Sequence, residues 1–264
     1  MTSTSAAEQT AALARGAVRP ALVVAFWLVV WQVAALVVGH EVLLASPAKA
    51  LVRLGELSLT ADFWGTIWYS FARIAGGFLA ASVIGVLGAA AAARSRIFDA
   101  LVSPALAAVR STPVVSFIIL VLMLAGSSQL AFVISFLMVL PITYTNVLEG
   151  IRHRDQTLLE VATVFEVPFL RRLPAIDVPA VLPFLTAACR IGVGLAWKSG
   201  IAAEVIGLTA GSIGERLYEA KILLSSADLF AWTAVIIAVS FGFEKLVVVA
   251  LRRTEVGLAQ GSLR

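Results

Sequence analysis

The chain has 264 residues, of which 60% are hydrophobic and only 14% are charged, with a formal net charge of +4. Soluble domains carry about 25% charged residues, so a chain this apolar cannot cover itself with polar surface and belongs in lipid. Its basic residues are then a signal of membrane topology and not a nucleic-acid footprint. The single cysteine, Cys189, excludes an internal disulfide framework.

A helix needs about 20 mostly apolar residues to cross the hydrocarbon of a bilayer. Six stretches are expected to do so: 21–38, 74–93, 101–125, 130–148, 183–208 and 229–251. The second extends backwards through Trp64 and Trp68. We therefore expect an all-α, polytopic membrane protein with these parts: an N-terminal tail over 1–20, a membrane domain over 21–251 containing a loop at 150–180, and a C-terminal tail over 252–264.

Basic residues in short loops predict the orientation of such a protein. With the N-terminus inside, the inner segments hold Arg15, Arg19, Arg94, Arg96, Arg152, Arg154, Arg171, Arg172, Arg252, Arg253 and Arg264. The outer segments hold Lys49, Arg53, Arg216 and Lys221, mixed with acids. This bias predicts a multi-pass protein of the cytoplasmic membrane with both termini in the cytoplasm.

Two outer segments have helical periodicity. Residues 47–57 are expected to lie along the outer interface, and residues 212–224 form a second short amphipathic helix. Ser212 can cap that second helix, and Glu215, three residues later, completes a capping box.

Small residues recur every fourth position in the second span. They are Gly77, Ala81, Gly85, Ala89 and Ala93. Such a ladder makes one helix face nearly flat, so another backbone can approach closely. The sequence does not say whether that neighbour belongs to the same chain.

Motifs of catalysis and of cofactor binding are absent from the sequence. There is no GxxxxGK[ST] phosphate loop, no GxSxG and no HExxH. One cysteine and two distant histidines make no metal site. The charges from Glu149 to Asp155 are interpreted as a solvated topology signal at a membrane exit. We expect no catalytic residue, no cofactor and no metal, and hence no enzyme.

The loop at 150–180 contains a compact amphipathic helix, expected over 157–165. Leu158, Leu159, Ala162 and Phe165 fall on one of its faces. Pro168 ends it, because the residue before a proline is pushed away from helical angles. A helix this short is marginal alone. It is stabilised either by docking its apolar face into a groove or by lying on lipid headgroups.

The sequence LLEVAT, leading into VPAVLP, resembles the "EAA" loop of ATP-binding cassette importer permeases. Glu160, Val161 and Ala162 match the E-A-A, and Leu182 and Pro183 match the terminal Leu-Pro. PALAAVRSTPVVSF, LTAACRIGVGLAWKSGIAAEVIG and GSIGERLYEAKILLSSADLFAWT agree with the nitrate/sulfonate/taurine-type branch. The resemblance covers nearly the whole chain after the first span and implies a type I importer permease fold, MetI-like, with six transmembrane helices.

This resemblance also implies partners. They are two cytoplasmic ATP-binding cassette subunits that hydrolyse ATP, a second permease copy in a homodimer or a related permease in a heterodimer, and an extracytoplasmic substrate-binding protein. The loop helix is then a coupling helix. Its expected contact residues are Leu158, Leu159, Glu160, Ala162, Thr163 and Phe165. Arg171 and Arg172 either add contacts or hold the loop at the headgroups.

One position departs from the family pattern. The glycine that follows the E-A-A is Glu166 in this chain. Glycine there permits a sharp turn, because it adopts positive φ without a steric penalty. The turn must instead be made by Glu166, Val167 and Pro168.

Charges inside the spans are costly and usually face protein or water. Lys198 is the leading candidate for the translocation pathway, where it would attract an anion; the alternative is a structural pair or a snorkelling side chain. Glu204 is a second candidate. For Arg190 and Arg110 a structural tie, to carbonyls or to Glu149, is favoured over a pathway role. Pro113 is a candidate kink.

The expected function is therefore the permease subunit of an ATP-driven importer of a small, anionic solute of the sulfonate, nitrate, taurine, bicarbonate or pyrimidine-precursor class. An ion-gradient-driven secondary transporter is the alternative. It predicts broken helices in two inverted halves and paired midplane carboxylates. A membrane scaffold or enzyme subunit is a further alternative, which predicts a polar catalytic cluster.

Overall fold

The computed structural model describes the backbone of residues 6–261 and the side chains of residues 22–253. Within these residues it contains helices and turns and no strand, so the predicted all-α class is confirmed. Two compact units divide the chain: Met1–Thr60 with Glu219–Thr233, and Ala61–Tyr218 with Ala234–Arg264. They are called unit 1 and unit 2 below.

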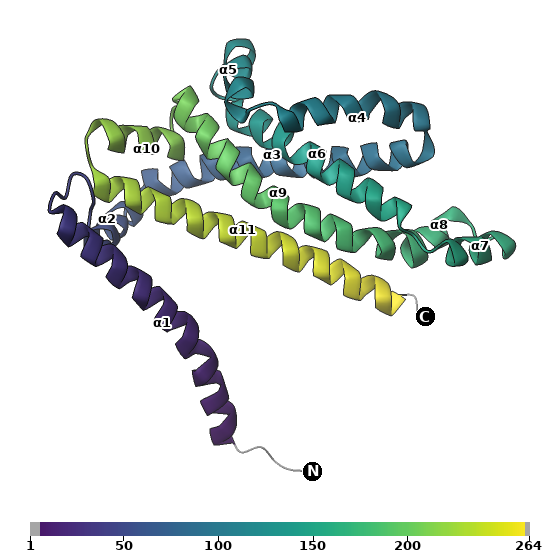
Figure 1. Ribbon diagram of the computed structural model, residues 1–264, viewed down its shortest axis with the longest axis horizontal. Helices are drawn as coiled ribbons and strands as arrows, with labels where there is room; N and C mark the ends of the chain where they lie inside the picture. Colours follow the sequence, from purple (N-terminus) through teal and green to yellow (C-terminus); the bar gives the residue numbers. More distant parts are fainter. Residues whose placement is uncertain (1–5, 262–264) are drawn as a thin grey trace. The chain divides into compact units, whose positions relative to one another are not determined.

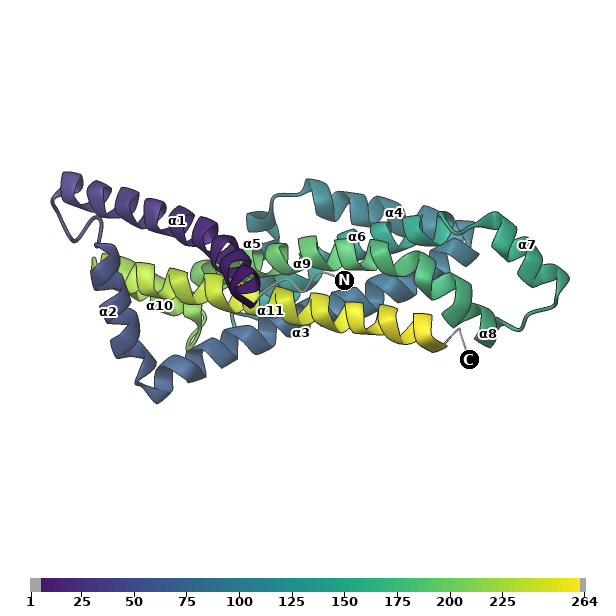
Figure 2. The same ribbon diagram turned by 90° about the horizontal axis from the view of Figure 1, so that it is seen from below.

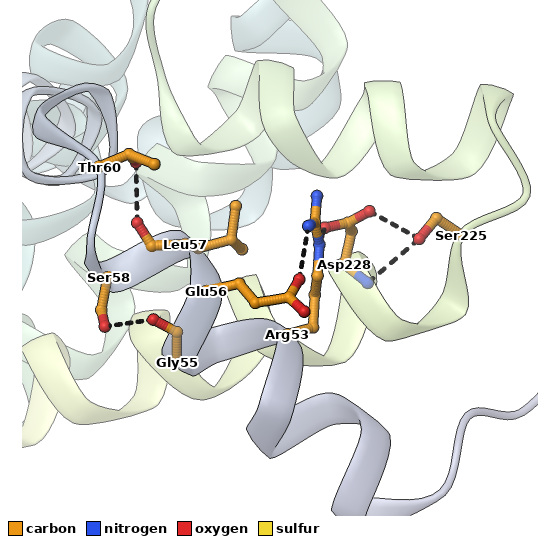
Figure 3. A network of polar contacts seen from close by, with 8 residues as sticks. All are labelled: Arg53, Gly55, Glu56, Leu57, Ser58, Thr60, Ser225 and Asp228. Carbon is orange, nitrogen blue, oxygen red and sulfur yellow. Dashed lines mark hydrogen bonds and ion pairs between the residues drawn. The ribbon is translucent and has the colours of Figure 1, made fainter.

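Unit 1 holds α1 (Ala6–Val38), α2 (Pro47–Ser58) and the first turns of α11 (Ser226–Gly261). Ser46 caps α2, which confirms the helix predicted over 47–57. Arg53 of α2 lies 2.5 Å from Asp228 and 2.9 Å from Glu56 (Figure 3). The hydrogen bond to Asp228 raises the pKa of Arg53, and this pair fastens α2 to the start of α11.

Unit 2 holds most of the helices (Figures 1 and 2). In chain order they are α3 (Ala61–Arg94), α4 (Arg96–Ser111), α5 (Val114–Ala125), α6 (Leu130–Arg152), α7 (Gln156–Val164), α8 (Phe169–Arg172), a π-helical turn (Leu173–Asp177), α9 (Val178–Gly207), the start of α10 (Ile213–Ile222) and the rest of α11. The helices α3, α6 and α9 run side by side, with α7 and α8 at one end and the start of α10 at the other.

Four helices of the described chain are long and apolar enough to cross a membrane: Ala61–Arg94, Leu130–Arg152, Phe169–Gly207 and Ser226–Arg253. The bent pair α4–α5 makes a fifth if it counts as one span. The described apolar part of α1, Leu22–Val38, is shorter. The expected count of six stays a prediction.

The span expected over 101–125, with a candidate kink at Pro113, is two helices with a sharp bend between them. The helices α4 and α5 meet at an angle of 105°. Thr112 has extended angles, φ −83° and ψ 133°, because the ring of Pro113 disfavours helical angles at the preceding residue. Pro141, by contrast, stays inside α6 without breaking it.

Close packing of α3 against α6 positions the rest of unit 2. A Cβ added to Gly77 would lie 2.3 Å from the carbonyl oxygen of Phe132, and one added to Gly85 would lie 2.8 Å from Cβ of Thr143. Ala81 and Ala89 are fully buried on the same face. The ladder is therefore confirmed from Gly77 to Ala89, and its neighbour is α6 of the same chain.

The substitution Gly77→Ala should lower the free energy of unfolding by about 1–3 kcal/mol, because its methyl group meets backbone that cannot move aside. Gly65→Ala is the matched control, since no atom lies within 4 Å of its Cβ position in the same helix. It should leave stability unchanged or raise it by up to about 1 kcal/mol. Thermal unfolding of the full chain in detergent measures both, and equal midpoints for the two variants would contradict this account of the packing.

Candidate functional site

The loop helix predicted over 157–165 is α7, Gln156–Val164. Oδ1 of Asp155 accepts hydrogen bonds from the backbone N–H groups of Thr157, at 2.8 Å, and Leu158, at 3.4 Å. This N-cap satisfies donors that otherwise lack a partner at a helix start. A nine-residue helix is marginal in water, so the cap matters more here than in a long span.

The C-terminus of α7 is a Schellman motif. The N–H of Val167 donates to the carbonyl of Ala162 at 2.8 Å, and the N–H of Glu166 donates to Thr163 at 3.1 Å. Glu166 adopts φ +47°, the left-handed conformation that this motif requires and that glycine usually supplies. The turn needed at this position is therefore made by a glutamate, at a steric cost of about 1–2 kcal/mol.

One side of α7 presents apolar side chains to the outside. Leu158 is 49% exposed, Val161 48%, Val164 78% and Phe165 76%; we call these four residues the apolar face of α7. Two of its members, Val161 and Val164, are not among the expected contact residues. Such a surface on a short helix is typical of a docking site.

The other expected contact residues of α7 differ in their exposure. Glu160 and Thr163 are exposed, and Leu159 is half-buried. The hydroxyl of Thr163 donates to the carbonyl of Leu159 within the helix, at 2.8 Å. Ala162 is only 5% exposed and faces its own chain. In this structure Ala162 therefore lies apart from the apolar face.

A buried carboxylate joins the two ends of the loop. Asp177, 7% exposed, forms an ion pair with Arg154, which precedes α7, and a second with Arg172 at the end of α8, with Nε 3.0 Å from Oδ2. Arg171 is exposed. Because both ends meet on one side chain, α7 and α8 are fastened to the start of α9.

The interpretation of residues 149–155 as a solvated cluster is wrong at Arg154, which forms an ion pair with the buried Asp177. Arg152 and Asp155 are exposed as expected, although Arg152 also lies 2.8 Å from Asp99 of α4 and Asp155 caps α7. Asp177 was missed by the sequence analysis. The one available signal was its place as the sole acid in the basic, proline-rich segment that leads into α9.

Two cations lie on an exposed face of α9. Arg190 and Lys198 are both exposed, and a Cβ added to Gly194, midway between them, would meet no atom within 4 Å. Neither cation has a hydrogen-bond or ion-pair partner among the residues whose side chains are described, and the same holds for Arg110 of α4. The expectation that Arg190 and Arg110 bind backbone carbonyls or Glu149 is therefore wrong within a single copy of the chain. Pro113, at the bend between α4 and α5, is exposed.

Glu204, by contrast, is completely buried. Its Oε2 accepts hydrogen bonds from the hydroxyl of Ser70 on α3, at 2.8 Å, and from the N–H of Gly214 at the start of α10, at 3.2 Å. Ser70 in turn accepts from the N–H of Ile213, at 2.9 Å. A Cβ on Gly214 would lie 2.4 Å from Cβ of Glu204, so only glycine allows this approach. In this structure Glu204 joins three helices and lines no open path.

The predicted cap of α10 is confirmed. The hydroxyl of Ser212 accepts a hydrogen bond from the N–H of Glu215 at 3.1 Å. The Glu215 carboxylate accepts a hydrogen bond from the N–H of Gly211 at 2.6 Å. A regular capping box would use the N–H of Ser212 instead. The start of α10 is thus held both by its own cap and by Glu204.

Introducing glycine at position 166, in the Schellman turn, should stabilise the loop. Glu166→Gly removes the left-handed penalty, and after the extra chain entropy of glycine we expect a net gain of about 0.5–1 kcal/mol. Hydrogen exchange at the amides of residues 166 and 167 should slow accordingly. Glu160→Gly, in the middle of the same helix, is the control and should speed exchange; faster exchange in both variants would contradict the role assigned to residue 166.

Comparison with known proteins places the chain in a family. The model of the family "Binding-protein-dependent transport system inner membrane component" matches residues 81–252. The nitrate import permease protein NrtB of Synechocystis is 31% identical, over 72% of this chain and 72% of the relative. The "Putative aliphatic sulfonates transport permease protein SsuC" of Bacillus subtilis is 26% identical, over 82% and 78%.

The bicarbonate transport system permease protein CmpB of Synechococcus elongatus is also similar, at 31% identity over 60% of this chain and 57% of the relative. The family match covers more than half of the chain, and it includes α7, α9 and the α3–α6 contact from Ala81 onwards. The chain belongs to the inner-membrane components of binding-protein-dependent transport systems, the permease subunits of ATP-binding cassette importers.

Proposed function

We propose that this permease subunit carries a small inorganic or organic anion across the cytoplasmic membrane, driven by a pair of separate ATPase subunits. Three similar proteins are named for nitrate, aliphatic sulfonates and bicarbonate, all of which are anions. The exposed cations of α9, Arg190 and Lys198, suit such a solute. We infer that both termini, with residues 1–20 and 252–264, lie in the cytoplasm and that the membrane domain spans 21–251.

In this proposal the apolar face of α7 docks in a cleft of the ATPase. The observation that carries the assignment is that Val164 and Phe165 are more than three-quarters exposed on a capped helix held at one end of the bundle. Exposed Glu160 offers a carboxylate to a basic group of the partner. Phe169 and Leu170, also exposed, extend the same apolar surface beyond the turn.

Movement of the ATPase reaches the spans through Asp177. Since Arg154 and Arg172 hold this carboxylate from the two ends of the loop, a displacement of α7 is passed to α9 as a rigid-body motion. Arg172 is therefore a tie within the loop, and only Arg171 is free to contact the partner or the headgroups.

The face of α9 that carries Arg190, Gly194 and Lys198 lies, in this proposal, against a second permease copy. Charged side chains facing lipid are costly, so these two need a partner surface or water. A homodimer would bring two such faces together around one cationic pathway. At the outer side, α2 and α10 are each placed to contact a substrate-binding protein.

The coupling assignment is tested by assembly. Phe165→Ala should weaken binding of the ATPase by about 2 kcal/mol, roughly 30-fold, because truncation of an exposed aromatic anchor removes an interface hot spot. Glu160→Ala should weaken it less. Met123→Ala, at a residue of α5 that is 81% exposed, is the matched control and should assemble normally. Co-purification and ATPase assays measure these effects, and normal assembly and turnover in both α7 variants would refute the coupling role.

The pathway assignment is tested at Lys198. Lys198→Met should lower uptake of the transported anion about tenfold or more, with assembly unchanged, because the cation that attracts the solute is lost. Lys245→Met replaces another exposed lysine, on α11, and should transport normally. Uptake of labelled nitrate, bicarbonate and alkanesulfonates into vesicles gives the measurement. Equal uptake by the two variants would rule out Lys198 as a pathway residue.

A further inference from the structure

We propose that unit 2 binds an anionic phospholipid in a groove along α3, with the phosphate at Arg94 and an acyl chain between α3, α9 and α11. The proposal goes beyond the transport function and does not depend on it. It rests on two adjoining cavities, on the charge at the end of one of them, and on a groove long enough to hold one acyl chain.

The first cavity, of about 440 Å³, lies at the α7 end of the bundle. Its walls are apolar, with Val86, Ala90 and Val147 among them. Three guanidinium groups and one carboxylate line it: Arg94, Arg154, Arg172 and Asp177.

The charge of this cavity is unbalanced. Asp177 is shared by Arg154 and Arg172, while Arg94 has no ion-pair partner among the described side chains. The cavity therefore carries a net charge of +2. Basic pockets between transmembrane helices are the sites that take anionic lipid headgroups.

The second cavity, of about 460 Å³, continues the first. It shares Val86 and Leu185 with it and lies between α3, α9 and α11. Its lining carries no charged residue, and it extends to Phe78 and Phe243, whose rings meet edge to face at 5.4 Å. An apolar groove that ends in a cationic pocket is complementary to an anionic amphiphile: the groove suits its apolar tail and the pocket suits its charged headgroup.

The length of the groove fits one lipid chain. Along α3, Val86 lies eight residues from Arg94, about 12 Å, and Phe78 lies sixteen residues away, about 24 Å. One leaflet of the hydrocarbon is about 15 Å thick. An acyl chain anchored by its phosphate at Arg94 would pass Val86 and end before the Phe78–Phe243 pair.

A free phosphate ion would satisfy the cationic pocket but would leave the apolar groove without an occupant. An acidic side chain of a partner protein would do the same. Of these three occupants, the lipid alone uses both cavities. A substitution that fills the groove without touching the charge therefore separates the lipid from these alternatives.

Native mass spectrometry of the full-length chain, purified in mild detergent, tests the proposal by counting retained phosphatidylglycerol and phosphatidylcholine. The unaltered chain should retain phosphatidylglycerol in preference. Arg94→Gln should lower its retention about fivefold, the factor expected for one basic residue near an anionic headgroup. Arg94→Lys should restore most of it, and Arg96→Gln, at an exposed arginine outside the cavity, should change nothing.

Ala250→Trp is the second variant. Ala250 is exposed and lines only the second cavity, which carries no charge, so the indole can enter the apolar groove without touching the cationic pocket. It should lower phosphatidylglycerol retention at least as much as Arg94→Gln does. Full retention in Ala250→Trp, displacement of the lipid by inorganic phosphate, equal retention of phosphatidylcholine, or equal losses in the Arg94 and Arg96 variants would each overturn the proposal.

Discussion

The backbones of α3 and α6 lie almost in contact because Gly77 and Gly85 carry no side chain. In lipid the hydrophobic effect does not drive helices together, so such van der Waals contact is a principal source of association. The close packing of α3 and α6 also brings both helices into contact with α9. Ser135, on the α6 face that meets Gly77, donates a hydrogen bond to the carbonyl of Ala196 at 3.1 Å. A Cβ on Gly200 would lie 2.7 Å from Ile74, so α9 also packs with backbone close to its neighbours. The three helices therefore pack closely as one group, with glycines at the points of closest approach.

Two buried carboxylates fasten that group at its ends. Asp177, at the start of α9, holds the loop that carries α7, and Glu204, one turn before its end, holds α3 and the start of α10. The helix α9 is continuous over its 30 residues, about 45 Å. In the proposed coupling, a rotation imposed at the α7 end would reach the start of α10 along this one helix. Removing the Glu204 carboxylate would leave the buried hydroxyl of Ser70 and the N–H of Gly214 without this acceptor, and an unsatisfied buried donor is costly.

The sequence was informative wherever a local rule decides the outcome. The periodicity of 157–165, the cap at Ser212 and the small residues from Gly77 to Ala89 all predicted what is observed, because each depends on neighbours within one or two turns. Other features depend on residues far apart in the chain. Asp177 pairs with Arg154 across 23 residues, and Glu204 meets Ser70 across 134. No spacing rule encodes those distances. The bend at Pro113 was expected only as a kink, because sequence cannot say whether the helix on the far side of a proline continues in the same direction.

The exposed cations of α9 impose a constraint on the assembled protein. A basic residue at the centre of a lipid-facing helix costs about 2.5–3.5 kcal/mol, and less near the interface. Arg190 and Lys198 lie eight residues apart, about 12 Å along α9, so only one of them can lie at the centre, but each adds to the cost in a single copy surrounded by lipid. The whole stability of a typical domain is only about 5–15 kcal/mol. The same cost disappears if this face borders water and a second copy, and Gly194 between the two cations leaves room for a neighbour. In the proposed homodimer, assembly and formation of a cationic pathway would both follow from one requirement: these two charges must be kept out of lipid.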